Sequence, residues 1–330
     1  MKAKRSIKII SILFIGLIYT IGPNCKNEHL HSIILTTTET IAISSTRVKS
    51  GGEISSSGGS EVVARGVCFS TNHTPTTSNN KTIDGTGEGP YISSMTDLQA
   101  NTVYYIRAYA INSSGTFYGT ELSVRTLETV SDIERNIYDI VIIGSMFWFV
   151  ENLKTTTFND GTKISLYSES PSISGWCWYN NDENIYRPTY GVLYNGYAVK
   201  TGKLCPVGWH VSTWEEWKKL IDTLGGPSLA GSKLKETGIT HWNSPNTDAT
   251  NESGFTAIPA GYLRQSYGTF EELGISGNWW AGQDFANSFG RLLRFDGGTV
   301  HIWAWTDIPI QLGQPYNPAL FGFSVRCVRN

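Results

Sequence analysis

The sequence predicts two β-rich domains, the first all-β and the second α+β. Three observations lead to this prediction. The chain contains 34 Gly, 16 Tyr and 11 Trp, a composition typical of short strands joined by many turns. Segments with strand-like alternation occur along the chain, whereas a clearly amphipathic helix occurs only at 213–224. A length of 330 residues fits about two domains, and 40% hydrophobic residues suffice for their cores.

Composition also limits the partners. There are 26 Lys and Arg against 28 Asp and Glu, so the net charge is −2. Nothing in this balance attracts a polyanion, and we expect no nucleic-acid partner. No CxxC, HxxH or Gly-x-Ser-x-Gly run occurs, and we expect no cofactor and no metal.

Residues 1–25 have the layout of a signal peptide. Basic residues come first, namely Lys2, Lys4, Arg5 and Lys8. The segment Ile9 to Ile21 is then largely apolar, but it is too short to span a bilayer comfortably. We therefore expect export, to the outer membrane, the cell surface or the medium. An uncleaved N-terminal anchor is the alternative.

Cys25 follows the apolar segment directly, and this position resembles the lipidated cysteine of a bacterial lipoprotein. The preceding Gly22-Pro23-Asn24 departs from the small residues usual there, so lipidation and simple cleavage both stay open. Contact with a membrane is expected only through this N-terminal anchor, if Cys25 is lipidated.

Residues 26–127 carry the pattern of a small β-sandwich. Strand-like alternation occurs at 62–69, a run of β-branched and aromatic residues at 103–110, and a last strand passes through Leu122 and Val124. Cys68 lies within a strand without an obvious partner, and we interpret it as a small buried hydrophobic residue.

Two runs in this segment carry a resemblance to a known family. They are Ala64-Arg65-Gly66-Val67-Cys68-Phe69-Ser70 and Leu98-x-x-Asn101-Thr102-x-Tyr104-Tyr105-x-Arg107-Ala108-Tyr109-Ala110-x-Asn112. The segment resembles a fibronectin type III-like module of bacterial surface proteins, which implies a spacer or presenting domain. A tyrosine early in a late strand also suits the tyrosine corner of such sandwiches.

Residues 128–136 are short and polar and are predicted to link the domains. The second domain, 137–330, opens with a strand at 137–144. A helix is predicted at 213–224, where Thr213 and Glu216 form a capping box, and a shorter helix at 228–236. Strands and long loops are expected after Phe255, so the domain is α+β and is expected to fold alone.

Several runs of the second domain carry a further resemblance. They are Phe149-Val150-Glu151-Asn152-Leu153, Cys177-Trp178-Tyr179-Asn180-Asn181-Asp182, Tyr190-Gly191-x-Leu193-Tyr194-Asn195, Leu204-Cys205-Pro206-x-Gly208-Trp209-His210-Val211, Leu234-Lys235-Glu236-Thr237-Gly238, His241-Trp242-Asn243-Ser244-Pro245-Asn246, Gly254-Phe255-Thr256-Ala257 and Gly322-Phe323-Ser324-Val325-Arg326-Cys327-Val328. Together they resemble the Fibrobacter succinogenes major paralogous domain. The resemblance implies a C-type-lectin-like fold and a cell-surface setting, but little chemistry. Gly196, Ala281-Gly282 and the stretch 303–317 depart from the family pattern.

Under this resemblance, Cys205 and Cys327 form the strongest disulfide pair, because they lie at the ends that close a loop in a lectin-like fold. A pair of buried thiols is the alternative. The loop would contain about 100 residues and would contribute roughly 4 to 5 kcal/mol in the chain-entropy model.

Ligand contact is predicted at Asp284, Trp303 and Trp305, where aromatic side chains alternate near polar residues in a loop-rich stretch. Trp279 and Trp280 could also stack on a ligand, but we favour core packing for both. The run 246–252 could offer oxygen ligands to Ca²⁺; it lacks EF-hand spacing, and a solvated loop is favoured.

Enzymatic activity is not expected, because the histidines are scattered and no catalytic pairing is visible. The sequence predicts an exported binding or adhesion protein that presents a lectin-like domain on a β-sandwich, with an extracellular glycan or a surface protein as its ligand. The alternative is a structural or fimbrial subunit without a small ligand.

Overall fold

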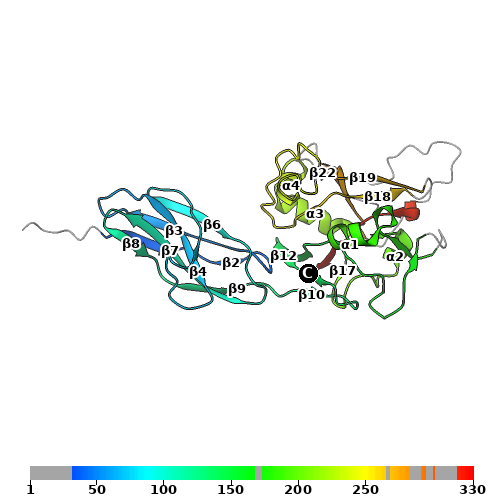
Figure 1. Cartoon of the computed structure of the whole chain (residues 1–330), viewed down its shortest axis with the longest axis horizontal. Coiled ribbons are helices and arrows are strands. Elements are labelled where there is room, and N and C mark those ends of the chain that lie inside the picture. Colours follow the sequence, from blue (N-terminus) through cyan, green and yellow to red (C-terminus); the bar gives the residue numbers. More distant parts are fainter. Residues whose placement is uncertain (1–31, 168–172, 265–267, 283–290, 295–299, 302–317) are drawn as a thin grey trace, which may run out of the picture.

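The computed structural model describes residues 32–330, apart from 168–172, 265–267, 283–290, 295–299 and 302–317. Two β-rich domains follow one another along the longest axis (Figure 1). Within the described residues, no helix is long and apolar enough to cross a membrane.

The first domain is a sandwich of two antiparallel sheets, as predicted. In one sheet, β3 (Val48–Ser56) is central and pairs with β1 (Ile34–Thr37), β2 (Ile41–Ala42) and β6 (Gly89–Met95). In the other, β7 (Val103–Asn112) pairs with β4 (Ala64–Ser70), β8 (Gly115–Tyr118) and β9 (Leu122–Arg125), and β5 (Asn80–Lys81) borders β4. Apolar side chains of the two sheets form the core, among them Val48, Val67, Ile106 and Ala108.

Two smaller expectations for this domain are confirmed. The hydroxyl of Tyr104 accepts a 3.0 Å hydrogen bond from the backbone N–H of Gln99, as in a tyrosine corner. Cys68 is fully buried and has no disulfide partner. Burial raises the pKa of its thiol to about 11.

The described part of the second domain contains three sheets of three or more strands, and the domain is α+β, as predicted. The first has the strand order β12 (Ile140–Ile143), β13 (Met146–Phe149), β24 (Cys327–Arg329) and β17 (His210–Val211). The second contains β14 (Ser165–Leu166), β15 (Gly175–Cys177) and β16 (Leu193–Tyr194). The third has the order β19 (Thr269–Leu273), β18 (Ala260–Arg264), β20 (Ser276–Trp279), β21 (Arg291–Arg294) and β22 (Val300–His301), and β23 (Phe321–Gly322) also pairs with β18. Because β13 and β24 are neighbours, the beginning and the end of the domain lie side by side.

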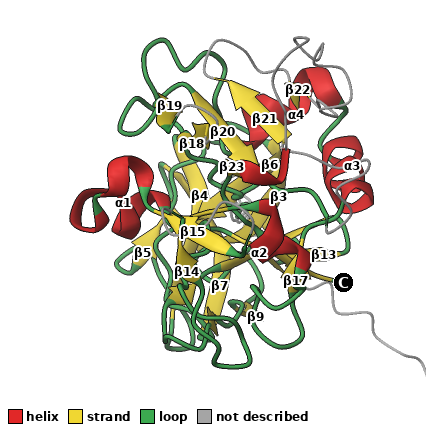
Figure 2. Ribbon diagram, turned by 90° about the vertical axis from the view of Figure 1, so that its right-hand side faces the viewer, coloured by secondary structure: helices red, strands yellow, loops and turns green. Residues whose placement is uncertain are grey.

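Four α-helices and two 3-10 helices complete the described part of this domain. They are η1 (Tyr179–Asn181), α1 (Glu183–Tyr190), α2 (Gly196–Lys200), α3 (Trp214–Thr223), α4 (Pro227–Leu234) and η4 (Pro318–Leu320). Helix α3 has the predicted capping box of Thr213 and Glu216, and α4 matches the shorter predicted helix. Helices α1 and α2 were not predicted. Figure 2 shows α1 and α3 on opposite sides of the molecule.

The segment 128–136, expected as a linker, is folded. It contributes β10 (Val130–Ser131), which pairs with β11 (Ile137–Tyr138). The buried Asp132 carboxylate closes this hairpin, because it accepts hydrogen bonds from the Tyr138 hydroxyl (2.6 Å) and the Asn136 amide (2.8 Å). Val130 also packs against the core of the second domain.

The two domains share backbone hydrogen bonds. Ser44 of the first domain forms an antiparallel bridge with Val141 of β12. Ile142 donates to the carbonyl of Ile43 (2.9 Å), and Ser45 donates to the carbonyl of Ile140 (3.0 Å). A turn of the first domain thus covers the free edge of β12, where unpaired backbone groups would otherwise be exposed.

Candidate functional site

The residues predicted to contact a ligand, Asp284, Trp303 and Trp305, lie outside the described residues. Their role therefore stays a prediction. The preceding Trp279 and Trp280 are fully buried, as favoured from the sequence. Their indole N–H groups donate to Asn152 Oδ1 (2.8 Å) and to the Tyr194 carbonyl (2.7 Å), so both belong to the core.

A fully buried arginine, Arg326, organises this core. Its guanidinium donates to Asn152 Oδ1 and to four backbone carbonyl oxygens, those of Phe149, Val150, Phe255 and Thr256. Its Cζ lies 4.5 Å from the ring centroid of Phe255. Burial lowers the pKa of Arg326 to about 9, so the side chain is charged at neutral pH. All of these contacts are to groups within the domain, so Arg326 stabilises the fold of the domain.

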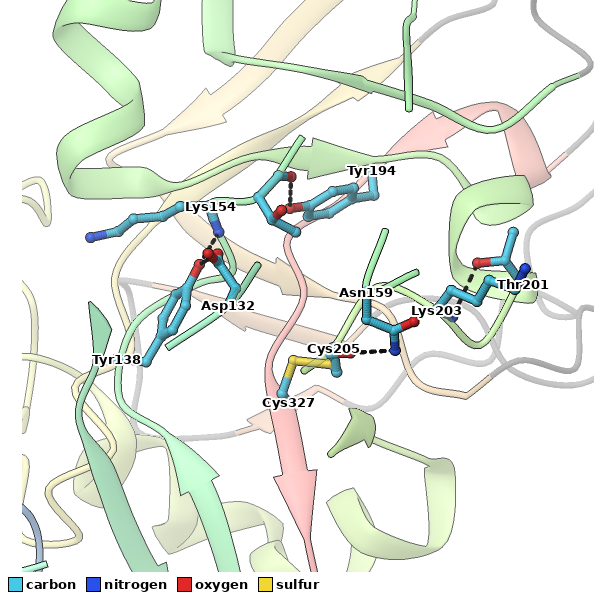
Figure 3. The surroundings of a disulfide bond; sticks show 10 residues. Asp132, Tyr138, Lys154, Asn159, Tyr194, Thr201, Lys203, Cys205 and Cys327 are labelled. Atoms are coloured by element: carbon cyan, nitrogen blue, oxygen red, sulfur yellow. Dashed lines mark hydrogen bonds between the residues drawn. A yellow bond between two sulfur atoms is a disulfide. The ribbon is translucent and has the colours of Figure 1, made fainter. Parts of the chain in front are cut away.

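The predicted disulfide between Cys205 and Cys327 is present and joins residues 122 positions apart (Figure 3). The carbonyl of Cys205 accepts a 2.9 Å hydrogen bond from the Asn159 amide. This bond fixes the loop that contains Asn159 against Cys205. The bond ties β24 to the Cys-Pro-x-Gly-Trp turn before β17. Cys177 is buried and free, and burial raises the pKa of its thiol to about 12.

The loop 246–252, which was considered as a source of Ca²⁺ ligands, is held in place by cationic side chains. The Nζ atom of the fully buried Lys235 donates to the Thr247 carbonyl (3.0 Å), and the Arg47 guanidinium donates to the Asn251 carbonyl (3.0 Å). Among the described residues, no group of three His, Cys, Asp or Glu side chains is placed to hold a metal ion.

A row of aromatic rings crosses the surface beside α1. We call the aromatic row the rings of Phe270, Tyr179, Tyr186, Tyr190 and His241. Successive ring centroids are 5.1, 5.3, 6.1 and 5.7 Å apart. All except Tyr179 are half-buried, and Tyr186 and Phe270 pack against the buried cluster that contains Tyr179. Figure 2 shows α1, which carries Tyr186 and Tyr190, at the outside of the domain.

Helix α1 has no fully buried side chain, and polar contacts hold it in place. Asp182 caps its N-terminus by accepting from the Ile185 N–H (3.2 Å). Arg187 forms ion pairs with Glu183 within the helix (2.7 Å) and with Glu134 of the preceding hairpin (3.3 Å). These contacts present the tyrosines four residues apart on one side of the helix.

A carboxylate lies beside one end of the aromatic row. Glu236 lies 2.8 Å from His241 Nδ1 and fixes that ring. Burial and the nearby Glu236 raise the pKa of the Tyr190 hydroxyl. At the other end, Glu271 lies on the opposite face of β19 from Phe270, where it accepts a 2.6 Å hydrogen bond from Tyr262. The row therefore combines aromatic faces with hydrogen-bond acceptors. Sequence reasoning missed it, although Tyr179, Tyr190 and His241 lie in the runs that carry the family resemblance.

Comparisons with known proteins give a family and several weak structural likenesses. No curated protein matches the chain. Solved structures that it resembles include the sensor domain of the anti-sigma factor RsgI4 of Pseudobacteroides cellulosolvens, at 12% identity over 29% of this chain and 95% of that one, with a TM-score of 0.23. A fibronectin type III domain of the human KIAA0970 protein is 16% identical over 31% of this chain and 79% of that one, with a TM-score of 0.22. A fibronectin type III domain of human collagen XX is 15% identical over 28% and 92%, with a TM-score of 0.21.

The family comparison covers more of the chain. Residues 141–329 match the family model of the Fibrobacter succinogenes major domain, which is more than half of the 330 residues. The match begins within β12, after the folded hairpin, and ends within β24. The chain therefore belongs to the Fibrobacter succinogenes major domain family.

Proposed function

We propose that this chain is an exported surface protein whose C-terminal domain binds a glycan through the aromatic row. The N-terminal sandwich presents that domain away from its attachment point. The observation that carries the proposal is the row itself, in which half-buried rings of Tyr186, Tyr190 and His241 lie at regular spacing, with the Glu236 carboxylate beside His241.

Sugars have two chemical features that fit such a surface. The C–H groups on one face of a pyranose ring form an apolar patch that can lie flat on an aromatic ring. The hydroxyl groups at its rim donate hydrogen bonds, which Glu236 can accept. The rings also contact one another and are already ordered, so binding costs little side-chain entropy.

The disulfide supports the proposed location. Cross-links between cysteines form and persist in oxidising compartments outside the cytoplasm, and Cys205–Cys327 is such a bond. Mass spectrometry of the protein from its own cells would test export. We expect cleavage within 22–25, with a diacyl or triacyl mass if Cys25 is lipidated. An intact Met1 on a cytoplasmic species contradicts the proposal.

A glycan array probed with the secreted chain, residues 26–330, tests the ligand. Replacing Tyr186 and Tyr190 together by Ala should abolish binding, since each anchor of a binding surface typically contributes about 2 kcal/mol. Tyr105→Ala is the matched control, because Tyr105 is half-buried on the N-terminal domain, far from α1 in the chain. Melting curves of all variants must agree within a few degrees. Equal binding by the double variant contradicts the proposed site.

A protein ligand and a structural role are the competing possibilities. A blank array together with stable polymerisation of the chain would favour a structural or fimbrial subunit. We further propose that binding occurs without catalysis. A bound oligosaccharide should be recovered with unchanged mass after prolonged incubation, and release of shortened products contradicts this part of the proposal.

A further inference from the structure

A pocket of about 310 Å³ that is open to solvent lies where the two domains meet, and we call it the interdomain cavity. Asn101, Arg125, Thr126, Leu127 and Glu128 line it from the first domain and the segment after it, and Ile140, Phe147 and Arg329 line it from the second. Its volume lies at the lower end of the range usual for small-molecule sites, which often occur at domain interfaces.

The walls of this cavity are fixed on both sides. Thr126 and Leu127 are held by the first domain, because Thr126 donates to the Thr102 carbonyl (3.0 Å) and Asn101 donates to the Leu127 carbonyl (2.9 Å). Leu127 also donates to the Ser44 carbonyl (3.3 Å), in the turn that pairs with β12. On the other side, Phe147 and Arg329 are paired residues of β13 and β24. The cavity is therefore largely formed before any ligand arrives.

Two arginines give this cavity its charge. The Arg329 Cζ lies 4.8 Å from the ring centroids of both Phe147 and Trp209, and these ring contacts leave its N–H groups free. Within the described part of the chain, Arg329 has no carboxylate or other hydrogen-bond acceptor. Arg125 donates through Nη1 to Asn101 (2.9 Å to the carbonyl) and has no ion pair among the same residues. Arginines without acidic partners are suited to bind a carboxylate or sulfate by paired hydrogen bonds.

The remaining lining residues indicate which other chemical features a ligand of this cavity should have. The buried Ile140 and the half-buried Leu127 and Phe147 form apolar surface next to the arginines. Glu128 is exposed and is the only acidic residue in the lining, so the two arginines leave a positive balance. An anionic group attached to a ring with an apolar face matches these features, whereas a neutral sugar offers no negative charge to the two arginines.

We propose that this cavity binds an anionic sugar, with its carboxylate or sulfate at Arg329 and Arg125. The inference rests on the proposed glycan-binding function for the class of ligand, and it adds a second site with a different chemistry. The aromatic row would take the neutral part of a glycan and the interdomain cavity an acidic unit.

Isothermal titration of the secreted chain with trigalacturonic acid tests this inference, with neutral galactotriose and a sulfated disaccharide as parallel probes. We expect trigalacturonic acid or the sulfated sugar to bind at least tenfold more tightly than galactotriose, and the tighter of the two identifies the anion. Raising the salt concentration should weaken the binding, because the contact is ionic. Equal affinity for galactotriose, or no binding of either anionic probe, overturns the proposal.

Variants separate this site from the aromatic row. Arg329→Gln should weaken binding of the anionic probe at least tenfold, and Arg329→Lys less, because a lysine keeps the charge but loses the paired donors. Arg125→Gln serves if Arg329→Gln fails to fold, since Arg125 is exposed. Lys219→Gln, on the exposed side of α3, controls for the loss of one positive charge. Unchanged affinity in both arginine variants overturns the inference. The double Ala variant at Tyr186 and Tyr190 should bind the anionic probe with unchanged affinity. The interdomain cavity can therefore be tested even if the aromatic row proves not to bind a glycan.

Discussion

The Oδ1 atom of Asn152 accepts a 2.8 Å hydrogen bond from Nε of Arg326, a residue 174 positions later in the chain. The same oxygen accepts from the indole N–H of Trp279. The amide nitrogen of Asn152 donates to the Tyr190 carbonyl (2.9 Å) and to Ser324 Oγ (3.3 Å). One buried side chain thus joins the start of the domain, the end of α1, β20 and the segment before β24. The frame that positions the aromatic row depends on this junction.

Arg326→Met should destabilise the C-terminal domain strongly. The substitution keeps an apolar stem but removes the donor of several buried carbonyl oxygens, and it leaves Asn152 Oδ1 with Trp279 as its remaining donor. Each buried acceptor left without a donor costs about 1 to 3 kcal/mol. Urea unfolding monitored by tryptophan fluorescence measures the loss. Lys219→Met, at an exposed position of α3, should change stability by less than about 0.5 kcal/mol. A comparable effect of both variants would contradict the role assigned to Arg326.

Replacing both Cys205 and Cys327 by Ala should lower the free energy of unfolding by about 4 to 5 kcal/mol, because the bond closes a long loop in the unfolded chain. Thiol titration gives an independent check. Cys68 and Cys177 are buried, and burial raises the pKa of each thiol, so neither should react before the chain unfolds. Reaction of the native protein at either cysteine argues against this arrangement.

Local signals explain which helices the sequence predicts. Helix α3 has a capping box and an apolar stripe in which Trp217, Leu220 and Ile221 are buried, and both features are visible in one short window. Helix α1 contains Pro188 and buries no side chain fully, and ion pairs together with partial packing hold it in place. Because a proline inside a window argues against a helix, α1 was not predicted from the sequence.

The site is less predictable than the fold for a related reason. The aromatic row joins residues from η1, α1, β19 and the loop after α4, and no spacing in the sequence relates Phe270 to Tyr179. The Asn152–Arg326 contact is equally remote in the chain. The Cys205–Cys327 pairing was predicted only because the family resemblance implied a fold in which these two residues lie close together. The interdomain cavity requires the edge pairing of Ser44 with Val141, for which the sequence contains no separate signal.

A fragment starting at residue 137 provides a test of the domain junction. The sequence predicts that it folds alone, and the structure adds that β12 would then lose the backbone partners Ile43 and Ser45, and that Tyr138 would lose Asp132 and β11 its partner β10. We expect the fragment to keep its disulfide but to self-associate through the uncovered edge. Sedimentation should show oligomers, and Ile142→Lys in the fragment should restore the monomer. A monomeric fragment as stable as the full chain would show that the junction contributes nothing to stability.

Glu216 should contribute a pH-dependent part of the stability of α3. Burial opposes its ionisation, but the Thr213 N–H (2.8 Å) and His210 (2.8 Å) outweigh burial and lower the pKa of Glu216. A carboxyl whose pKa is lower in the folded state than in the unfolded state stabilises the fold above its unfolded pKa, which is about 4.5. That contribution is lost as the pH falls through the lower, folded pKa.

The variant Glu216→Gln isolates this charge, since Gln can still accept the Thr213 hydrogen bond. At neutral pH it should be less stable than the native chain by about 0.5 to 1 kcal/mol, the usual contribution of a carboxylate at a helix N-terminus. The difference should shrink as the pH is lowered through the folded pKa, because the native side chain then also becomes neutral. Melting curves from neutral to acid pH provide the measurement. Glu215→Gln, in the same turn but exposed, controls for the general loss of a negative charge, and an equal pH dependence in that variant would contradict the specific role of Glu216.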